Sequence, residues 1–392
     1  MPGVPKKALA TGRGWRALGT LSAWALAGIL AASLTLVAQS KPAQPAPSVN
    51  GGNGKLYIGT YRGDIHIYDE ATEKLEDRIV LKTGLPRSLL PSQDRTRFYV
   101  LNSTYEQIEV VDIASRKTLN TFTLSTGNKH MRVISMQADP LNRYLVLLTR
   151  TATKLIDRWE IGAPTLQQFD LASGQITRTI PWPRGEERET VNLRFSPDGK
   201  LLYFFGDEVI IVDAEKFEEV ETWPYTQPSE SGQGRINLGP VHDFYDAPGT
   251  FTGLFTMQDP VQKRRIMGFG KVDLTARKIE FRPIGPAEQV SFAQAPDRKR
   301  AYGIKSDIGR YEFWTFDLEK VSVVSRQEFT GRPRMVPRVS SNGRIIYVYN
   351  AGQTIDLYEA ATYKYLRTIQ MGADQTTELF VVPAASATSS AR

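Results

Sequence analysis

Short stretches that combine β-branched and aromatic residues recur along the chain between turn residues, a pattern typical of β-strands. One set is centred on aromatic residues: Lys55–Thr60, Arg97–Asn102, Arg143–Leu148, Leu201–Gly206, Thr252–Met257, Arg300–Lys305 and Ile345–Asn350. A second set ends on an acidic residue at the start of a turn: Asp69, Asp112, Asp170, Asp213, Asp273, Asp317 and Glu359. Self-similarity with a period of about 40–50 residues indicates a propeller or an array of repeats.

Each of the seven repeats can be written as four strands. The first strands of the repeats are predicted near Ser88, Val133, Leu193, Phe244, Phe292, Val339 and Phe380. The last of them, Glu378–Pro383, has no strands after it, whereas the repeat that begins at Lys55 has no strand before it. Pairing these two ends would remove exposed sheet edges. We therefore expect an all-β fold, a seven-bladed β-propeller of four-stranded antiparallel blades over residues 55–383, closed by pairing of the C-terminal strand with the N-terminal blade.

The seven acidic residues are interpreted as turn residues. A carboxylate at the start of a turn accepts hydrogen bonds from backbone N–H groups a few residues further on and fixes the hairpin. The tyrosines of the aromatic strands are likewise expected to pack one blade against the next. Neither set is assigned a catalytic role.

The first 40 residues have the layout of an export signal. Lys6, Lys7, Arg13 and Arg16 precede the uncharged segment Ala17–Ser40, which ends in small residues. The alternative is a permanent anchor formed by residues 17–38, since about 20 apolar residues suffice to cross a bilayer. We expect a periplasmic or secreted protein, exported through the general secretory route, with membrane association only if this segment is not cleaved. Residues 41–54 read as a Pro/Gly-rich linker, and residues 384–392 are predicted to be a disordered tail.

Charge and cysteine content exclude several classes of function. The formal charge is +7, but four of the basic residues lie in the N-terminal segment, and no basic face is concentrated in the rest. No nucleic-acid partner is therefore expected. The chain has no cysteine, which excludes disulfides, thiolate nucleophiles, Cys-ligated zinc, iron–sulfur clusters and covalent haem attachment. We expect no cofactor on this chain.

Two of the intervals between acidic residues are longer than the others. The intervals are 43, 58, 43, 60, 44 and 42 residues, and the excess lies in Thr149–Thr165 and Pro224–Pro240. Both segments should emerge on the same face of the propeller. Long loops on a rigid scaffold often carry binding residues, so Arg158, Trp159 and Arg235 are candidates, and a protein partner is expected on this face.

The first strands should begin at this same face, around the central channel. Residues near their starts are Arg87, His130, Glu189, His242, Glu288 and Arg334. Such a ring of charges could bind a polar ligand or a cation, or it could simply be a solvated rim. Of the three histidines, only His130 and His242 could be joined by Glu189 in a metal site, and no metal site is assigned.

One repeated pattern resembles a known family. The pattern begins with an apolar strand after Pro86 or Pro240 and continues with a turn such as Ser196–Lys200, an aromatic strand and a strand that ends in Val-Asp. This order of segments resembles the YVTN family of seven-bladed β-propellers. Residues 154–213 are also similar to the propeller subunits of periplasmic quinoprotein amine dehydrogenases. That similarity implies a redox complex whose cofactor sits on another subunit.

These observations favour an exported, non-catalytic scaffold that binds a protein or a ligand. The alternative is a lactonase-like hydrolase, because similar propellers open lactone rings at the channel mouth with His, Glu and Arg side chains. In this chain, that resemblance implies His130, His242, Glu189 and Arg334.

Overall fold

The computed structural model describes residues 48–206, 208–224, 237–238, 244–259, 263–307, 309–349 and 352–384. From Val49 onward these residues belong to one compact unit. The predicted export segment, the anchor at 17–38 and the tail at 385–392 lie outside the described residues. Within the described ranges, no helix has the length and apolar character needed to cross a membrane.

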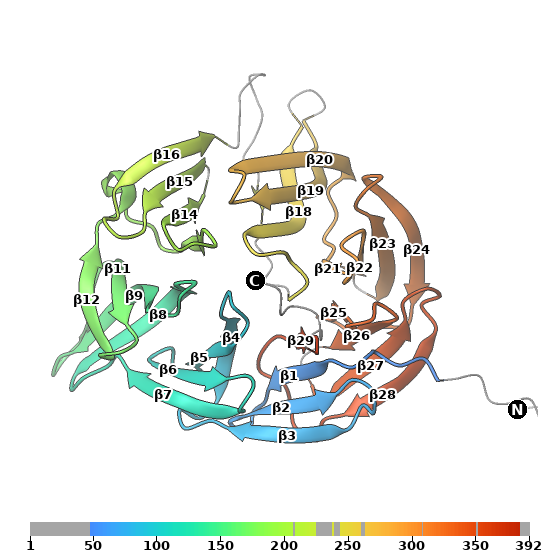
Figure 1. Ribbon diagram of the computed structural model, residues 1–392, viewed down its shortest axis with the longest axis horizontal. Helices are drawn as coiled ribbons and strands as arrows, with labels where there is room; N and C mark the ends of the chain where they lie inside the picture. Colours follow the sequence, from blue (N-terminus) through green and yellow to red (C-terminus); the bar gives the residue numbers. More distant parts are fainter. Residues whose placement is uncertain are drawn as a thin grey trace, which may run out of the picture. The chain divides into compact units, whose positions relative to one another are not determined.

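The described residues form seven antiparallel sheets arranged in a ring, which confirms the seven-bladed β-propeller (Figure 1). Six blades have four strands, and blade 3 has an additional short one. Blade 1 comprises β29 (Phe380–Val382), β1 (Lys55–Gly59), β2 (Asp64–Asp69) and β3 (Leu75–Val80). Blade 2 comprises β4 (Pro86–Pro91), β5 (Arg97–Asn102), β6 (Gln107–Asp112) and β7 (Lys117–Thr123). Blade 3 comprises β8 (Lys129–Ala138), β9 (Tyr144–Lys154), β10 (Trp159–Ile161), β11 (Thr165–Asp170) and β12 (Gln175–Ile180).

The remaining blades follow in chain order. A 3₁₀ turn, η1 (Pro183–Gly185), precedes blade 4. Blade 4 comprises β13 (Asn192–Phe195), β14 (Leu201–Phe205), β15 (Glu208–Asp213) and β16 (Glu219–Pro224). Blade 5 comprises β17 (Asn237–Leu238), β18 (Thr250–Gln258), β19 (Arg265–Asp273) and β20 (Lys278–Pro286). Blade 6 comprises β21 (Ala293–Gln294), β22 (Arg300–Asp307), β23 (Arg310–Asp317) and β24 (Ser322–Phe329). Blade 7 comprises β25 (Val336–Val339), β26 (Ile345–Tyr349), β27 (Thr354–Glu359) and β28 (Tyr365–Gln370).

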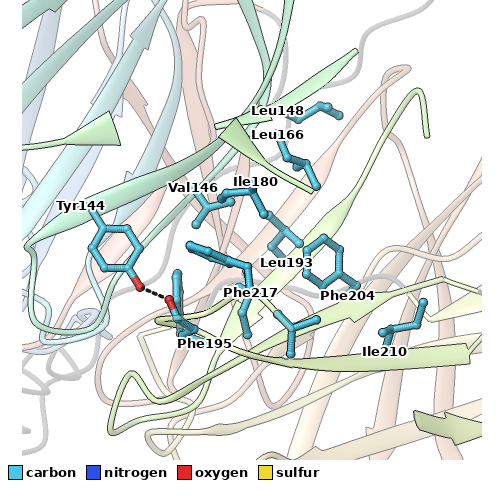
Figure 2. Packing of buried hydrophobic residues seen from close by; sticks show 13 residues of the cluster. Tyr144, Val146, Leu148, Leu166, Ile180, Leu193, Phe195, Phe204, Ile210 and Phe217 are labelled. Carbon is cyan, nitrogen blue, oxygen red and sulfur yellow. Dashed lines mark hydrogen bonds between the residues drawn. The ribbon is translucent and has the colours of Figure 1, made fainter. Parts of the chain in front are cut away.

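The core lies between neighbouring blades. Figure 2 shows one such layer, in which Tyr144, Val146 and Leu166 of blade 3 pack against Phe195 and Phe204 of blade 4. Burying aromatic and aliphatic side chains of this size stabilises the fold by about 1.5–3 kcal/mol each. The fold therefore depends on each blade having a neighbour on both sides.

The tyrosines of the second strands link successive blades, as predicted. The Tyr144 hydroxyl donates to the carbonyl oxygen of Ala214 at 3.1 Å, and the Tyr203 hydroxyl donates to that of Leu274 at 2.9 Å. Each acceptor directly follows the acidic turn residue of the next blade, Asp213 or Asp273. The two repeated features of the sequence therefore meet at the same blade-to-blade contact.

The acidic residues fix the hairpin turns, which confirms their interpretation. The Asp112 carboxylate accepts from Ser115 N–H at 2.7 Å, and the Asp213 carboxylate accepts from the N–H groups of Glu215 and Lys216 at 2.9 and 2.8 Å. Hydrogen bonding to the charged form favours it. Bonds from the Ser115 side chain and backbone accordingly lower the pKa of Asp112.

The ring closes as predicted. Strand β29 pairs with β1 in antiparallel register, with Tyr57 opposite Phe380. Next to this junction lies the buried Glu70, whose carboxylate accepts from Gly54 N–H at 2.9 Å, from Ser341 N–H at 3.0 Å and from the Tyr347 hydroxyl at 3.0 Å. The Ser341 hydroxyl also donates to this carboxylate. Glu70 thus joins blade 1 to blade 7.

Blade 5 departs from the prediction. Its first strand is not at Phe244 but at β17, where Asn237 lies opposite Thr256. Phe244 belongs to the connection that leads into β18. The Phe244 side chain is buried, as the apolar side chains of a first strand are. It is buried against other blades across the channel, however, and not within a sheet of blade 5. The sequence pattern indicates that a residue is buried but not which elements bury it.

His66 supplies a pH-dependent contribution to stability. It is fully buried in β2, with Nε2 3.3 Å from an Asp64 carboxylate oxygen and Nδ1 3.2 Å from the Tyr68 hydroxyl. Burial lowers the pKa of His66, even though Asp64 acts in the opposite direction. The unfolded chain, with a pKa of about 6.5, then binds the proton more readily than the native state. The stability conferred by neutral His66 is present above about pH 6.5 and is lost as the pH falls toward the lower native pKa.

We therefore expect the unfolding free energy to fall below pH 6.5 by up to about 1.4 kcal/mol per pH unit. Denaturant titrations between pH 5 and 8 measure this slope. His66→Gln cannot titrate and should give a flatter profile, whatever its absolute stability. Equal slopes for the two proteins would contradict this role of His66.

Candidate functional site: a channel cavity beside a projecting ribbon

A cavity of about 740 Å³ opens into the central channel. Its walls come from inner strands of four blades and from the connections at their starts. Apolar residues predominate on the walls, with polar side chains among them: Arg87, Ser88, Leu89, Leu90, Leu101, Tyr105, Ile134, Ser135, Met136, Arg334, Val336, Tyr349, Gln375, Thr376, Thr377, Glu378 and Phe380. Its volume and its mostly apolar lining with a few polar groups are typical of small-molecule sites.

The inner end of the cavity is backed by the connection that precedes β18. Phe380 lines the cavity, and its ring packs on Phe98 and Phe244 with centroids 5.6 and 5.9 Å away. The next residue, Tyr245, donates its hydroxyl to the Val339 carbonyl of blade 7 at 2.8 Å. This connection of blade 5 therefore crosses the channel to blades 1, 2 and 7, and in Figure 1 it reaches toward the centre of the ring. We call the cavity beside this connection the cup.

Arg87 and Arg334 share the mouth of this cup. Arg87 Nε donates to the Tyr105 hydroxyl at 2.7 Å, and the Arg132 guanidinium lies 4.9 Å from the centroid of the same ring. Among the described residues, no carboxylate oxygen lies within 4.0 Å of a side-chain nitrogen of Arg87 or Arg334. The acidic group of the lining, Glu378, is instead paired with Arg338 at 2.6 Å. The mouth therefore carries positive charge.

Two of the lining residues, in the connection before β29, carry buried oxygen atoms that accept no hydrogen bond from the described protein: Oε1 of Gln375 and Oγ1 of Thr376. Leaving a buried polar atom unpaired costs about 1–3 kcal/mol. Because both atoms are closed to solvent, they belong to the cavity wall and do not face its interior.

Blade 3 extends beyond its neighbours as a β-ribbon. Strands β8 and β9 have 10 and 11 residues, whereas β13 and β14 of blade 4 have 4 and 5. The six additional residues in each strand correspond to a projection of about 20 Å. The predicted excess at Thr149–Thr165 is thus ordered β-structure, in which β10 pairs with the end of β9.

The tip of the ribbon exposes apolar side chains. Leu155 N–H donates to the Arg158 carbonyl at 2.8 Å across the terminal turn. Ile156 in this turn is fully exposed, and Trp159 and Ile161 of β10 are 50% and 61% exposed. Burying such residues against a partner would be favourable, and exposed apolar groups gathered in one patch mark interaction sites.

His130 belongs to the ribbon and not to the cavity. Its ring packs edge-on against Trp159 at 5.3 Å, and its Nδ1 lies 3.2 Å from a Glu106 carboxylate oxygen. The Lys154 ammonium lies 6.0 Å from the centroid of the Trp159 ring. These contacts hold the tryptophan side chain against the ribbon while leaving about half of it exposed.

The other predicted site residues are dispersed. Glu189 forms an ion pair with Arg150, with a distance of 2.5 Å, and Glu288 pairs with Lys305 at 3.0 Å. Arg158 contacts its neighbours Asp157 and Glu160 at the ribbon tip. Arg235 and His242 lie outside the described residues. Of the three described residues named for the lactonase-like alternative, Arg334 lines the cavity and His130 and Glu189 do not, and that alternative stays a prediction.

Within the described ranges, no three His, Asp or Glu side chains are grouped so that they could hold a metal ion. Sequence reasoning missed Tyr105 and Gln375, which lie in connections between strands. Tyr105 follows the second strand of blade 2, and Gln375 shortly precedes β29. This proximity to the strands at the channel mouth was the only sequence signal that could have indicated them.

The described chain is thus a seven-bladed β-propeller with a cup in its channel. It matches no family among the known protein families and none of the curated proteins. Its fold is similar to that of hydrazine synthase from Kuenenia stuttgartiensis, with 14% identity, 85% of this chain and 99% of the other covered, and a TM-score of 0.47. It is also similar to dihydro-heme d1 dehydrogenase NirN, with 12% identity, coverages of 86% and 77%, and a TM-score of 0.49. AztD from Citrobacter koseri gives 14% identity, coverages of 85% and 98%, and a TM-score of 0.49. At these identities and TM-scores, the similarities carry no conclusion about ligand or activity.

Proposed function

We propose that this chain is an exported, non-catalytic β-propeller that binds a protein partner through the blade 3 ribbon. The observation that carries the proposal is the apolar tip, Ile156, Trp159 and Ile161, on a projecting β-structure. A tip without a binding role would be expected to carry polar residues, because exposed apolar edges invite aggregation.

The ribbon indicates the chemistry of the partner. Trp159 has a large apolar surface and few rotatable bonds, and tryptophan is enriched among residues that dominate binding energy. Lys129 and Lys154 lie beside the apolar tip, together with Asp157, Arg158 and Glu160, so an apolar patch bordered by residues of both charges fits it best. On its outer edge, β10 has no partner strand among the described strands, which would also allow a strand of the partner to pair there.

The N-terminal sequence supports the cellular setting of this proposal. A basic segment followed by an uncharged one supports export to the periplasm or beyond. The similarity of residues 154–213 to propeller subunits of quinoprotein amine dehydrogenases makes a redox complex of that kind our preferred setting, with the cofactor on another subunit. The same segment includes β10, the exposed strand of the ribbon.

Purification of the tagged full-length chain from the native host, followed by mass spectrometry and an absorption spectrum, tests the proposal. We expect a partner in stoichiometric amount. The triple variant Ile156→Ser, Trp159→Ser, Ile161→Ser should lower the affinity for that partner at least about 100-fold, since tryptophan hot spots alone contribute 2 kcal/mol or more.

The matched control is Val220→Ser with Val324→Ser, two apolar residues on outer strands that are 54% and 61% exposed. It should leave the affinity unchanged. Recovery of the wild-type chain only as a monomer would contradict the proposal, as would equal binding by the triple variant and the control.

A further inference from the structure

We infer that the channel cup binds a small organic anion with an apolar body, whose acidic group lies between Arg87 and Arg334. This inference goes beyond the proposed protein interaction and does not depend on it. It rests on the placement of charge and apolar surface around one cavity.

The charge at the mouth favours an anion. Both guanidinium groups line the cavity, and within the described part of the chain neither has a carboxylate within 4.0 Å. The lining carboxylate of Glu378 faces the largely buried Arg338 at 2.6 Å and is thereby largely neutralised. Arg132, stacked on the Tyr105 ring, adds a third positive charge nearby. Charge-assisted bonds from arginine to a carboxylate or phosphate are among the strongest hydrogen bonds in proteins.

The walls favour an apolar body on that anion. Between the mouth and Phe380, the lining side chains are mainly aliphatic: Leu89, Leu90, Leu101, Ile134, Met136 and Val336. A bare inorganic anion would leave this surface in contact with water. A ligand with a hydrocarbon portion would gain about 25 cal/mol for each Å² of apolar surface that it buries.

The connection through Phe244 supports one wall of the cup. The Phe244 ring packs on Phe380, which lines the cup, and Tyr245 donates to the Val339 carbonyl of blade 7. Strand β8 contributes Ile134 and Met136 to the wall and also forms one edge of the ribbon. The two sites thus share a strand while using different residues.

Isothermal titration calorimetry on the purified full chain at low salt tests this inference. The probes are 3-phenylpropionate, the neutral 3-phenylpropan-1-ol, the cationic 3-phenylpropylamine, 3-phenyllactate and inorganic phosphate. We expect both organic acids to bind at least about 10-fold more tightly than the alcohol, since the alcohol cannot form a charge-assisted hydrogen bond with the arginines. Phosphate and the amine should bind at least 10-fold more weakly than phenylpropionate.

Variants link binding to the mouth. Arg87→Gln with Arg334→Gln should weaken phenylpropionate binding at least 10-fold and leave the alcohol unaffected. Arg344→Gln, which changes an exposed arginine in the Ser340–Arg344 turn away from the cavity, is the control and should bind like the wild type. Thermal unfolding of each variant establishes that it is folded, and Arg334→Lys, which keeps the charge, should lose less affinity than Arg334→Gln.

Three results would overturn the inference: no binding by either organic acid, the same affinity for the acid and the alcohol, or unchanged affinity in the double variant. Phosphate binding as tight as that of phenylpropionate would overturn the requirement for an apolar body. None of these results bears on the ribbon, so failure here is distinguishable from failure of the proposed function.

Discussion

A chain that ends at Thr377, and so lacks β29, is expected to lose cooperative folding. The removed segment contains Leu379, Phe380 and Val381, all buried, and Phe380 packs on both Phe98 and Phe244. Burying three such side chains contributes about 5–9 kcal/mol. That is comparable with the whole stability of a typical domain, about 5–15 kcal/mol. The truncation also exposes the edge of β1, which normally pairs with β29, so aggregation should increase.

Circular dichroism and denaturant titration measure this loss. A chain that ends at Ala384 keeps the whole of β29 and is the matched control, with stability close to that of the full chain. Adding a synthetic peptide of residues 378–384 to the shorter chain should restore part of the signal if ring closure is the cause. A cooperative transition at an unchanged denaturant midpoint in the shorter chain would contradict this role of β29.

Glu70→Ala is expected to destabilise the fold by about 3–5 kcal/mol. The Glu70 carboxylate is buried and accepts hydrogen bonds from Gly54 N–H, Ser341 N–H and the Tyr347 hydroxyl. Alanine would leave these donors in a space closed to water, and each unpaired buried group costs about 1–3 kcal/mol. Removing one member of a buried charged network usually costs more than the network contributes as a whole.

Glu70→Gln is the informative companion variant. Glutamine keeps the shape of the side chain, but its NH₂ group would face backbone and hydroxyl donors and could not accept their hydrogen bonds. We therefore expect the unfolding free energy to fall by less than in Glu70→Ala. Glu319→Ala changes an exposed carboxylate on blade 6 and should shift stability by less than about 0.5 kcal/mol. A loss of under 1 kcal/mol for Glu70→Ala would show that blades 1 and 7 do not depend on this carboxylate.

Much of the fold could be predicted because its signals are local. Alternation along a strand and a carboxylate at the start of a turn depend on neighbouring residues, as at Asp112 and Asp213. Counting these signals predicts the number of blades. The repeat that begins at Lys55 lacks its first strand, and the first strand that begins at Glu378 has no strands after it. This complementarity predicts the closure of the ring, because the unpaired strand at each end requires a partner.

The candidate site could be predicted only in part. Position at the start of a first strand was enough to indicate Arg87 and Arg334, which the structure brings to one cavity. The same criterion also selected Glu189 and Glu288, which form ion pairs elsewhere. Side-chain direction and partners decide between these outcomes, and neither follows from spacing along the chain.

By itself, the sequence determined the repeat, the turns and the long insertion at Thr149–Thr165, because strand pattern and turn chemistry act over a few residues. Tertiary structure decided that this insertion is an ordered ribbon, that Phe244 packs against Phe98 and Phe380 of other blades and that Arg87, Arg334 and Gln375 share one cup. These residues lie far apart along the chain, and ring closure alone brings them together. Their common environment is therefore a property of the closed propeller rather than of any single repeat.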